Sequence, residues 1–248
     1  MHSLLLALTG LLNRLFGASI TALLNKFHIY PLHPATPISD RLTLELVVAL
    51  VMVLFFIAVR ATLSVEKPGS LQHLAEMVHG FVDEQAQSVM GHHGYEAHLP
   101  FVTTILVFVL LCNVMGLLPH IDTPTASPVV PLGIAVVTFF YYNWYGVRTQ
   151  GPIGYAKHFM GPIWWIAPLM FPIEIISNLA RVMSLTVRLY ANMFASDLLT
   201  LVFFSLVPIG IPIIFLGLHF GVALIQAYVF MLLAMIYLGE ATAVHDAH

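Results

Sequence analysis

The hydrophobic positions of the chain gather into runs long enough to cross a lipid bilayer. A hydrocarbon core about 30 Å thick needs roughly 20 mostly apolar residues per helix. Runs close to this length cover residues 42–59, 101–118 and 129–145. The last of these ends in a group of tyrosines and a tryptophan before Arg148, which is typical of a membrane interface. The pattern therefore predicts a spanning helix in each run.

The apolar region at 164–207 is longer than one straight crossing needs. As a helix it would extend about 66 Å, roughly twice the thickness of the core. We expect it to tilt steeply, to kink or to fold back, with Pro168 and Pro172 breaking it near its start. The turn residues at 207–212 and the apolar run at 213–238 then predict a returning helix. Residues 164–239 are thus predicted to form a tilted helical hairpin.

Two further helical segments are predicted not to span. Residues 71–90 place apolar side chains at helical spacing opposite acidic ones, which fits an interfacial amphipathic helix or a helix that packs on a partner. The apolar N-terminal segment has interleaved polar residues and lacks the early positive charge of a signal peptide, so we expect a membrane-surface helix. The predicted organisation is a tail at 1–40 followed by a single membrane domain at 41–248.

Composition supports a membrane protein and excludes several other classes. The chain is 59% apolar and only 8% charged, whereas soluble domains carry about 25% charged residues. The net charge of −3 and the lack of a basic cluster argue against binding to nucleic acid. The single cysteine, Cys112, excludes an intrachain disulfide and a CxxC site.

The distribution of basic residues predicts the topology. An outside N-terminus places four basic residues beside inside loops, and the outside loop at 119–128 has no Lys or Arg. The four are Arg60, Lys67, Arg148 and Lys157. Basic residues in the N-terminal tail, Arg14, Lys26 and Arg41, run against this pattern. The C-terminus is then expected on the inside.

Polar residues recur along the long helix at intervals of three or four, which places them on one stripe of an α-helix. They are Glu174, Asn178, Arg181, Ser184, Arg188 and Asn192. Asp197 lies half a turn away from Arg188 in azimuth and about 13 Å along the axis. On the returning helix His219 and Gln226 share a face, and the hairpin brings that face alongside Asp197.

Arg188 is the residue that most strongly indicates function. Ionisable groups inside a membrane cost several kcal/mol, and apolar side chains surround this position. A guanidinium keeps its proton, so Arg188 is predicted to act as a fixed positive charge. Such a charge favours the ionised form of a nearby carboxyl group and makes that group release its proton. The alternative is a structural ion pair with Glu174 or Asp197. The polar amides and Ser184, taken singly, also fit helix–helix hydrogen bonding without further function.

The titratable residues lie on both sides of this cation. Glu174 lies toward one end, and Asp197 with His219 lies toward the other. Such groups exchange protons within membranes. The sequence therefore predicts two separate proton paths with a positive barrier between them.

The segment PIEIISNLARVMSLTVRLYANMFA at 172–195 resembles the signature of the subunit a family of F-type ATP synthases, the proton-channel stators of a membrane rotary motor. The stretches NVMGLLP at 113–119, PTAS at 124–127 and QAYVF at 226–230 match further landmarks of that family in the same order. The resemblance covers about residues 40–240.

The resemblance implies an all-α polytopic membrane protein with about five spanning helices, an interfacial helix and a steeply tilted C-terminal hairpin. It implies that Arg188 faces the carboxylates of a rotating c ring and that Asn192 is the polar residue one turn beyond it. Asp197, His219 and Gln226 match the outer proton path, and Glu174 and Ser177 match the inner one. Many relatives have Glu or His where this chain has Asp197, so we expect a water molecule to bridge the shorter side chain to His219.

The implied partners are the c ring, the peripheral stalk b subunits, other ATP synthase subunits, the lipid bilayer and protons. No GxxxxGK[ST] motif is present, so ATP chemistry is expected in partner subunits and not in this chain. Neither a cofactor nor a metal is expected. The expected location is a bacterial inner membrane, with H⁺ rather than Na⁺ as the coupling ion.

Two other classes of membrane protein share some of these features. A secondary transporter typically shows internal repeats, and the sequence has none that we detect. A membrane metalloenzyme or haem protein is suggested by thirteen histidines, yet most of them fall in predicted loops or tails. These include His92, His93, His98, His245 and His248.

Overall fold

The computed structural model describes residues 2–26, 37–64, 69–91, 94–118, 123–160, 167–206 and 210–242, and every regular element in these ranges is helical. The predicted all-α class is thereby confirmed. The elements are α1 (His2–Lys26), α2 (Asp40–Ala61), α3 (Ser70–Met90), η1 (Tyr95–His98), α4 (Leu99–Met115), η2 (Pro124–Ala126), α5 (Val129–Met160), α6 (Ala167–Leu206) and α7 (Ile211–Thr242).

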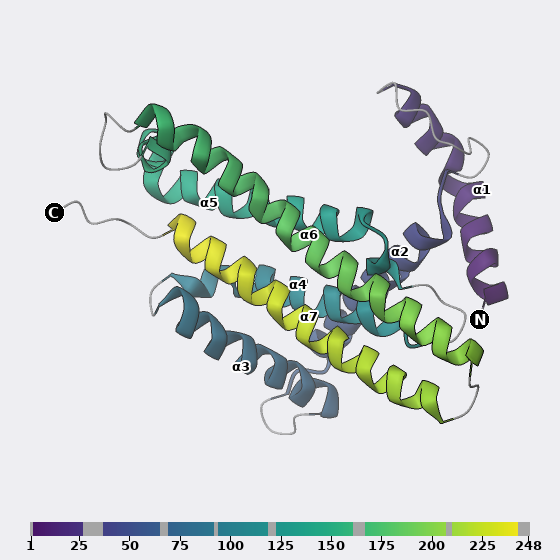
Figure 1. Cartoon of the computed structure of the whole chain (residues 1–248). Coiled ribbons are helices and arrows are strands. Elements are labelled where there is room, and N and C mark those ends of the chain that lie inside the picture. The colour runs from purple at the N-terminus through teal and green to yellow at the C-terminus, as the bar shows by residue number, and fades with distance from the viewer. Residues whose placement is uncertain are drawn as a thin grey trace.

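Helix α7 lies at the centre of the bundle. It runs antiparallel beside α6, with α4 and α5 behind the pair, α3 along its other side, and α1 and α2 grouped at one end (Figure 1). Phe230, Met231 and Met235 of α7 are fully buried, in one apolar cluster with Val109 of α4 and Leu189 of α6. The core thus holds the two helices of the predicted hairpin against the rest of the chain.

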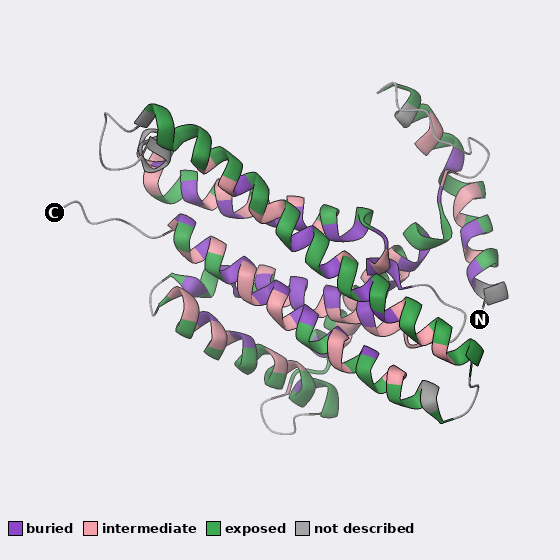
Figure 2. Ribbon diagram, in the orientation of Figure 1, coloured by how far each residue is buried: buried purple, intermediate pink, exposed green. Residues whose placement is uncertain are grey.

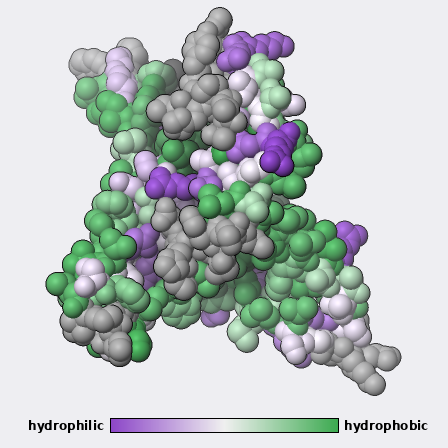
Figure 3. Space-filling view, turned by 90° about the vertical axis from the view of Figure 1, so that its right-hand side faces the viewer, coloured by the Kyte–Doolittle hydropathy of each residue, from purple (hydrophilic) through white to green (hydrophobic). Residues whose placement is uncertain are grey.

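Five helical segments are long and apolar enough to cross a membrane. They are Leu5–Leu23, Asp40–Ala61, Tyr95–Met115, Pro168–Leu206 and Ile213–Thr242. The set includes α1, which the sequence predicts at the membrane surface. It does not include α5, which the sequence predicts to span at 129–145, because that apolar run ends in Tyr141, Tyr142 and Tyr145. Hydrophobic side chains cover much of the face in Figure 3, with hydrophilic ones in separate patches, as expected of a surface in contact with lipid.

Two helix boundaries differ from the sequence predictions. Helix α5 continues past Tyr145 to Met160 and changes direction at Gly151, whose φ of +73° is accessible to glycine at little cost. Helix α6 begins at Ala167 and continues through Pro172, so the predicted break is wrong. Pro168 lies in the first turn, where a missing N–H costs nothing, and Pro172 removes only one hydrogen bond close to the helix start.

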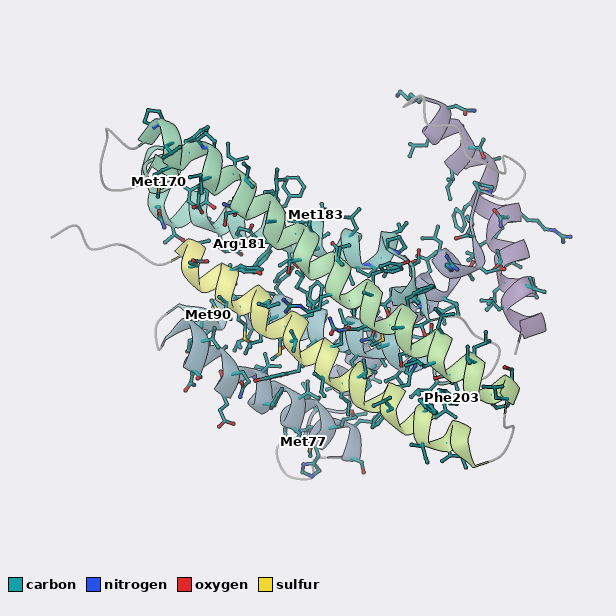
Figure 4. All side chains as sticks on the ribbon, in the orientation of Figure 1. Met77, Met90, Met170, Arg181, Met183 and Phe203 are labelled. Atoms are coloured by element: carbon teal, nitrogen blue, oxygen red, sulfur yellow. The ribbon has the colours of Figure 1, made fainter. Side chains whose placement is uncertain are left out.

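The turn that joins α6 to α7 lies partly outside the described residues, because 207–209 are not described. The two helix ends are nevertheless held together by Phe203 of α6 and Phe215 of α7, whose stacked ring centroids are 3.9 Å apart (Figure 4). This contact confirms that the two helices return on one another as a hairpin.

Helix α3 presents two faces of different character. Val82 and Ala86 are buried in the core cluster, and Gln85 accepts a hydrogen bond of 2.9 Å from the Tyr228 hydroxyl of α7. The apolar side chains Met77 and Phe81 remain exposed on the other face. One side of α3 therefore packs on this chain, and the other suits the expected position at a membrane surface.

Helix α1 is attached to the start of α2. The Thr9 hydroxyl donates to the Thr43 hydroxyl at 3.0 Å, and both side chains are buried. The Asn13 amide bonds both backbone groups of Ile38, donating to its carbonyl and accepting from its N–H, each at 3.0 Å. Polar contacts thus hold α1 against the start of α2.

Candidate functional site

The residues of the polar stripe of α6 differ in how far they are buried. Asn178 is buried, Arg181 is partly buried, and Ser184, Arg188 and Asn192 are exposed. The stripe advances at intervals of three and four, whereas a helical turn takes 3.6 residues, so its members move around the helix relative to the buried face. Figure 2 shows the long exposed side of α6 that turns away from the bundle. The stripe therefore starts against the bundle and passes onto its outer surface.

Arg188 lies on this outer surface. Within the described part of the chain its guanidinium makes no hydrogen bond or ion pair, and the alternative pairing with Glu174 or Asp197 is not formed. Glu174 lies about 21 Å away along the axis, and Asp197 projects from the opposite side of the helix. Arg188 is thus a cation that the described residues leave uncompensated.

Asp197 and His219 meet at the end of the α6–α7 hairpin. The Asp197 Oδ1 lies 3.4 Å from the His219 Nδ1 and accepts a hydrogen bond of 2.9 Å from the Thr123 hydroxyl. The imidazole is buried, whereas the carboxylate is partly exposed. The two atoms lie close together but beyond the roughly 2.7–3.2 Å of an N–H···O hydrogen bond, so the bridging water stays a prediction.

Helix α4 completes this group, which we call the Asp197 cluster: Asn113, Thr123, Thr125, Asp197 and His219. The Asn113 backbone carbonyl lies 3.4 Å from His219 Nε2. The buried Asn113 amide donates to the Ala223 carbonyl at 3.3 Å and accepts from the Thr125 hydroxyl at 2.6 Å. The histidine is therefore held between two segments far apart in the sequence, with a polar atom beside each ring nitrogen.

Gln226 belongs to a second polar contact of the hairpin. Its side-chain carbonyl accepts a hydrogen bond of 2.8 Å from the Asn192 amide, which joins α7 to the exposed stripe of α6. Both residues line a cavity of about 300 Å³ whose other walls are largely apolar. As predicted, His219 and Gln226 share the face of α7 that meets α6, but only His219 meets Asp197.

The opposite end of the hairpin holds the other carboxylate of α6. Glu174 accepts a hydrogen bond of 3.3 Å from Asn178, whose side-chain oxygen accepts one of 2.9 Å from the Tyr142 hydroxyl of α5. Ser177 is partly buried and makes no side-chain hydrogen bond among the described residues. The structure therefore links Glu174 to a polar network and leaves Ser177 beside it without a direct contact.

Arg181 extends this network to α7. Its guanidinium donates to Glu240 at 2.7 Å and lies 5.0 Å from the centre of the Tyr237 ring. Figure 4 shows Arg181 on the side of α6 that faces α7. We call this group the Arg181 cluster: Tyr142, Tyr155, Glu174, Asn178, Arg181, Tyr237 and Glu240. These residues line a cavity of about 30 Å³, enough for a single water molecule.

Tyr155 lies in this cluster, ten residues beyond the predicted end of the α5 span. Burial raises the pKa of its phenol. The charge of Arg181 lowers this pKa, and the charge of Glu174 raises it. The phenol therefore stays protonated at neutral pH and donates to the Asn143 side-chain oxygen at 2.8 Å.

Several residues of both clusters were not predicted. Thr123, Thr125 and Asn113 occur within or beside the landmark stretches, but no helical periodicity relates them to the hairpin. Glu240 lies at the end of an apolar run, where a charged side chain ordinarily marks the solvent-exposed end of a helix. The usable signal was its lone acidic character opposite Arg181 in an antiparallel hairpin.

No group of three potential metal ligands occurs among the residues that the structure describes. His98 lies in an aromatic setting, with its Nδ1 3.2 Å from the Tyr141 hydroxyl and its ring 4.6 Å from that of Tyr145. His92, His93, His245 and His248 lie outside the described residues.

Comparisons with known proteins agree on one family. Residues 42–239 match the family model described as ATP synthase A chain. The chain is 52% identical over 235 residues to the ATP synthase subunit a of Koribacter versatilis, covering 95% of this chain and 96% of that relative. The subunit a of Solibacter usitatus is 45% identical over 209 residues, covering 84% and 89%. The ATP synthase subunit a 3 of Pelobacter propionicus is 41% identical over 209 residues, covering 84% and 90%.

Proposed function

Because the chain belongs to the ATP synthase A chain family, we propose that it is the proton-conducting stator subunit of a rotary ATP synthase, with two offset half-channels that lead to the c ring. The subunit is not catalytic by itself, and ATP chemistry belongs to other subunits of the complex. Arg188 is the barrier between the two half-channels.

One observation carries this proposal: the α6–α7 hairpin has a cluster of titratable and polar groups at each end, with an uncompensated arginine between them. Glu174 and Asp197 lie about 21 Å and about 13 Å from Arg188 along the axis of α6. Protons in a membrane need such groups, and a fixed cation between two inlets prevents direct passage from one to the other.

The outer half-channel is formed by Asp197, His219, Asn192 and Gln226. The 3.4 Å contact between Asp197 and His219 supports proton exchange there, because carboxylate and imidazole both titrate. The hydrogen bond between Asn192 and Gln226 lies nearer to Arg188 and joins the two helices where protons would pass to the ring. The roughly 300 Å³ cavity beside this pair supports access from that side.

The inner half-channel is formed by Glu174 with Ser177. Its support is the hydrogen-bonded network around Glu174 and the small polar cavity that this carboxylate lines. Ser177 lies one turn from Arg181 on the same helix and would contribute its hydroxyl to a proton path.

In operation, a proton enters by the outer half-channel, neutralises a c-ring carboxylate and lets that carboxylate move into lipid. After nearly a full turn of the ring, the proton leaves by the inner half-channel. Arg188 would attract the ionised carboxylate by about 4 kcal/mol at 4 Å and an effective dielectric near 20. Each proton contributes about 2.3 kcal/mol per 100 mV of membrane potential, so several are needed per ATP.

The partners are the c ring, the peripheral stalk b subunits and the remaining ATP synthase subunits. The exposed side of α6 that carries Arg188 is the surface offered to the ring. The relatives named above are bacterial, which supports a bacterial inner membrane as the location. The proposed topology has the N-terminus outside and the C-terminus in the cytoplasm, with H⁺ as the coupling ion.

The decisive experiment is Arg188→Ala in membrane vesicles. ATP-driven proton pumping should vanish while the complex assembles and the detached catalytic head still hydrolyses ATP, because only the barrier is lost. Arg60→Ala is the matched control, since Arg60 is an exposed arginine at the end of α2, and it should pump like the parent. Undiminished coupled pumping by Arg188→Ala would refute the proposal.

A further inference from the structure

Helix α6 carries two arginines in contrasting environments. Arg181 has an ion pair with Glu240 at 2.7 Å and lies over the Tyr237 ring. Arg188 has no hydrogen bond or ion pair among the described residues and lies on the exposed side. The same side chain is thus compensated at one position and left uncompensated seven residues later.

Arg181 lies midway between Glu174 and Arg188. Each interval is seven residues, about 10 Å along the helix axis, and all three side chains belong to one stripe. Glu174, Arg181 and Glu240 line the same small cavity, together with polar groups of α5 and α7. In the proposed function, a proton that travels from the ring to the inner side passes this cavity and therefore passes Arg181.

An arginine in this place would oppose the passage of a cation. Its guanidinium does not release a proton, and its side chain is only 22% exposed, so solvent screens it incompletely. Glu240 bonds it at the distance of a strong charge-assisted contact. The carboxylate itself is 53% exposed, so it compensates the charge without being buried.

We propose that Glu240 is a charge-compensating residue of the inner proton path: by pairing with Arg181, it prevents this second arginine from acting as another barrier beside Arg188. This inference rests on the proposed function. Glu240 lies just beyond the residues matched by the family model, which end at 239. The structure identifies Arg181 as the partner of Glu240, because the two residues are 59 positions apart in the sequence and meet only in the fold.

The test compares Glu240→Gln with the double variant Arg181→Gln/Glu240→Gln in the intact complex. Glu240→Gln keeps the size of the side chain and leaves Arg181 charged. Repulsion equal to one pKa unit would lower the initial rate of ATP-driven proton pumping about tenfold. In the double variant the charge of Arg181 is removed as well, so nothing is left for residue 240 to compensate. Loss of the partly exposed Arg181–Glu240 ion pair costs little stability, so this variant should pump within about twofold of the parent.

Glu84→Gln is the matched control, because Glu84 is an exposed carboxylate on α3 outside the cavity, and it should pump like the parent. Rates are normalised to the amount of assembled complex. Should Glu240→Gln fail to assemble, Glu240→Asp and the double variant carry the test. The first keeps the negative charge and the second removes both charges, so both should pump.

Normal pumping by Glu240→Gln would overturn the inference. Equal losses in Glu240→Gln and the double variant would also overturn it, since Glu240 would then clamp the two helices or carry protons itself. Arg188→Ala is measured in parallel and reports on the proposed function separately. If Arg188→Ala loses pumping while Glu240→Gln retains it, only the inference about Glu240 fails.

Discussion

Gly116 lies against the Asp197 cluster, at a position with no room for a side chain. A Cβ atom added there would overlap the Thr123 hydroxyl oxygen and would lie 2.9 Å from the Thr123 Cβ and 3.3 Å from the His219 Cε1. Thr123 donates to Asp197, and His219 contacts the same carboxylate. The absence of a side chain at Gly116 is therefore a condition for this cluster to form.

We expect Gly116→Ala to reduce proton pumping, because Thr123 must move away from Asp197. Overpacking of this kind costs about 1–3 kcal/mol, so the melting temperature of the purified complex should also fall. Gly133→Ala is the control, since a Cβ there meets nothing within 4 Å and alanine favours a helix. Parental pumping and stability in Gly116→Ala would show that the cluster tolerates a displaced Thr123.

The sequence predicts the meeting of Asp197 and His219, but not the residues that hold them. The spacing of polar positions on two antiparallel helices is enough to bring those two side chains together. Asn113 and Thr123 reach the cluster from another part of the chain, and such contacts depend on tertiary packing that has no local periodicity. Glu240 differs from these, because it lies on the hairpin itself, opposite Arg181; the sequence does not single it out, since a charge at the end of an apolar run is ordinarily solvated.

At the level of helices, the apolar runs predict where each element lies, and their ends are less well predicted. Hydrophobicity marks the part of a helix in lipid, whereas hydrogen bonding continues into polar surroundings, as in α5 beyond Tyr145. Pro172 misleads for a different reason, because a proline close to a helix start removes few hydrogen bonds. The pairing of α1 with α2 depends on Asn13 and Thr9, which hydrophobic periodicity does not reveal.

We expect Asn13→Ala to loosen the attachment of α1 to α2. The substitution leaves the N–H and carbonyl of Ile38 without their partner, and an unpaired buried polar group costs about 1–3 kcal/mol. Hydrogen–deuterium exchange of residues 37–43 in the complex should become faster. Thr21→Val is the control, because among the described residues the Thr21 hydroxyl bonds just one group, the Gly17 carbonyl of its own helix. Unchanged exchange in Asn13→Ala would mean that other contacts hold the two helices.

Viewed whole, the molecule places Arg188 on an outer surface. Large apolar side chains dominate the exposed residues, but three of the residues that flank Arg188 on its own side of α6, beside Asn192, are small: Ser184, Ala191 and Ala195. Small side chains permit the close approach of another helix in a membrane. The surface around Arg188 is therefore suited to a partner that moves past it at short range.

We expect Ala191→Trp to block coupled proton pumping, because an indole beside Arg188 would collide with the proposed c ring. Met183→Trp is the control on the same helix, since Met183 is 57% exposed and lies about 140° around the helix from Arg188, so it should face lipid. It should retain pumping. ATP synthesis and ATP-driven pumping in vesicles measure both variants, and normal activity of Ala191→Trp would place the ring elsewhere.

The single continuous helix α6 also limits how this chain can evolve in length. Glu174, Arg181, Arg188 and Asp197 share one rod without a break. One inserted residue between any two of them would rotate everything beyond it by about 100° and advance it by about 1.5 Å. Glu240 would then lose Arg181, or His219 would lose Asp197. We therefore expect the chain to tolerate insertions and deletions in the connections between helices and not within α6.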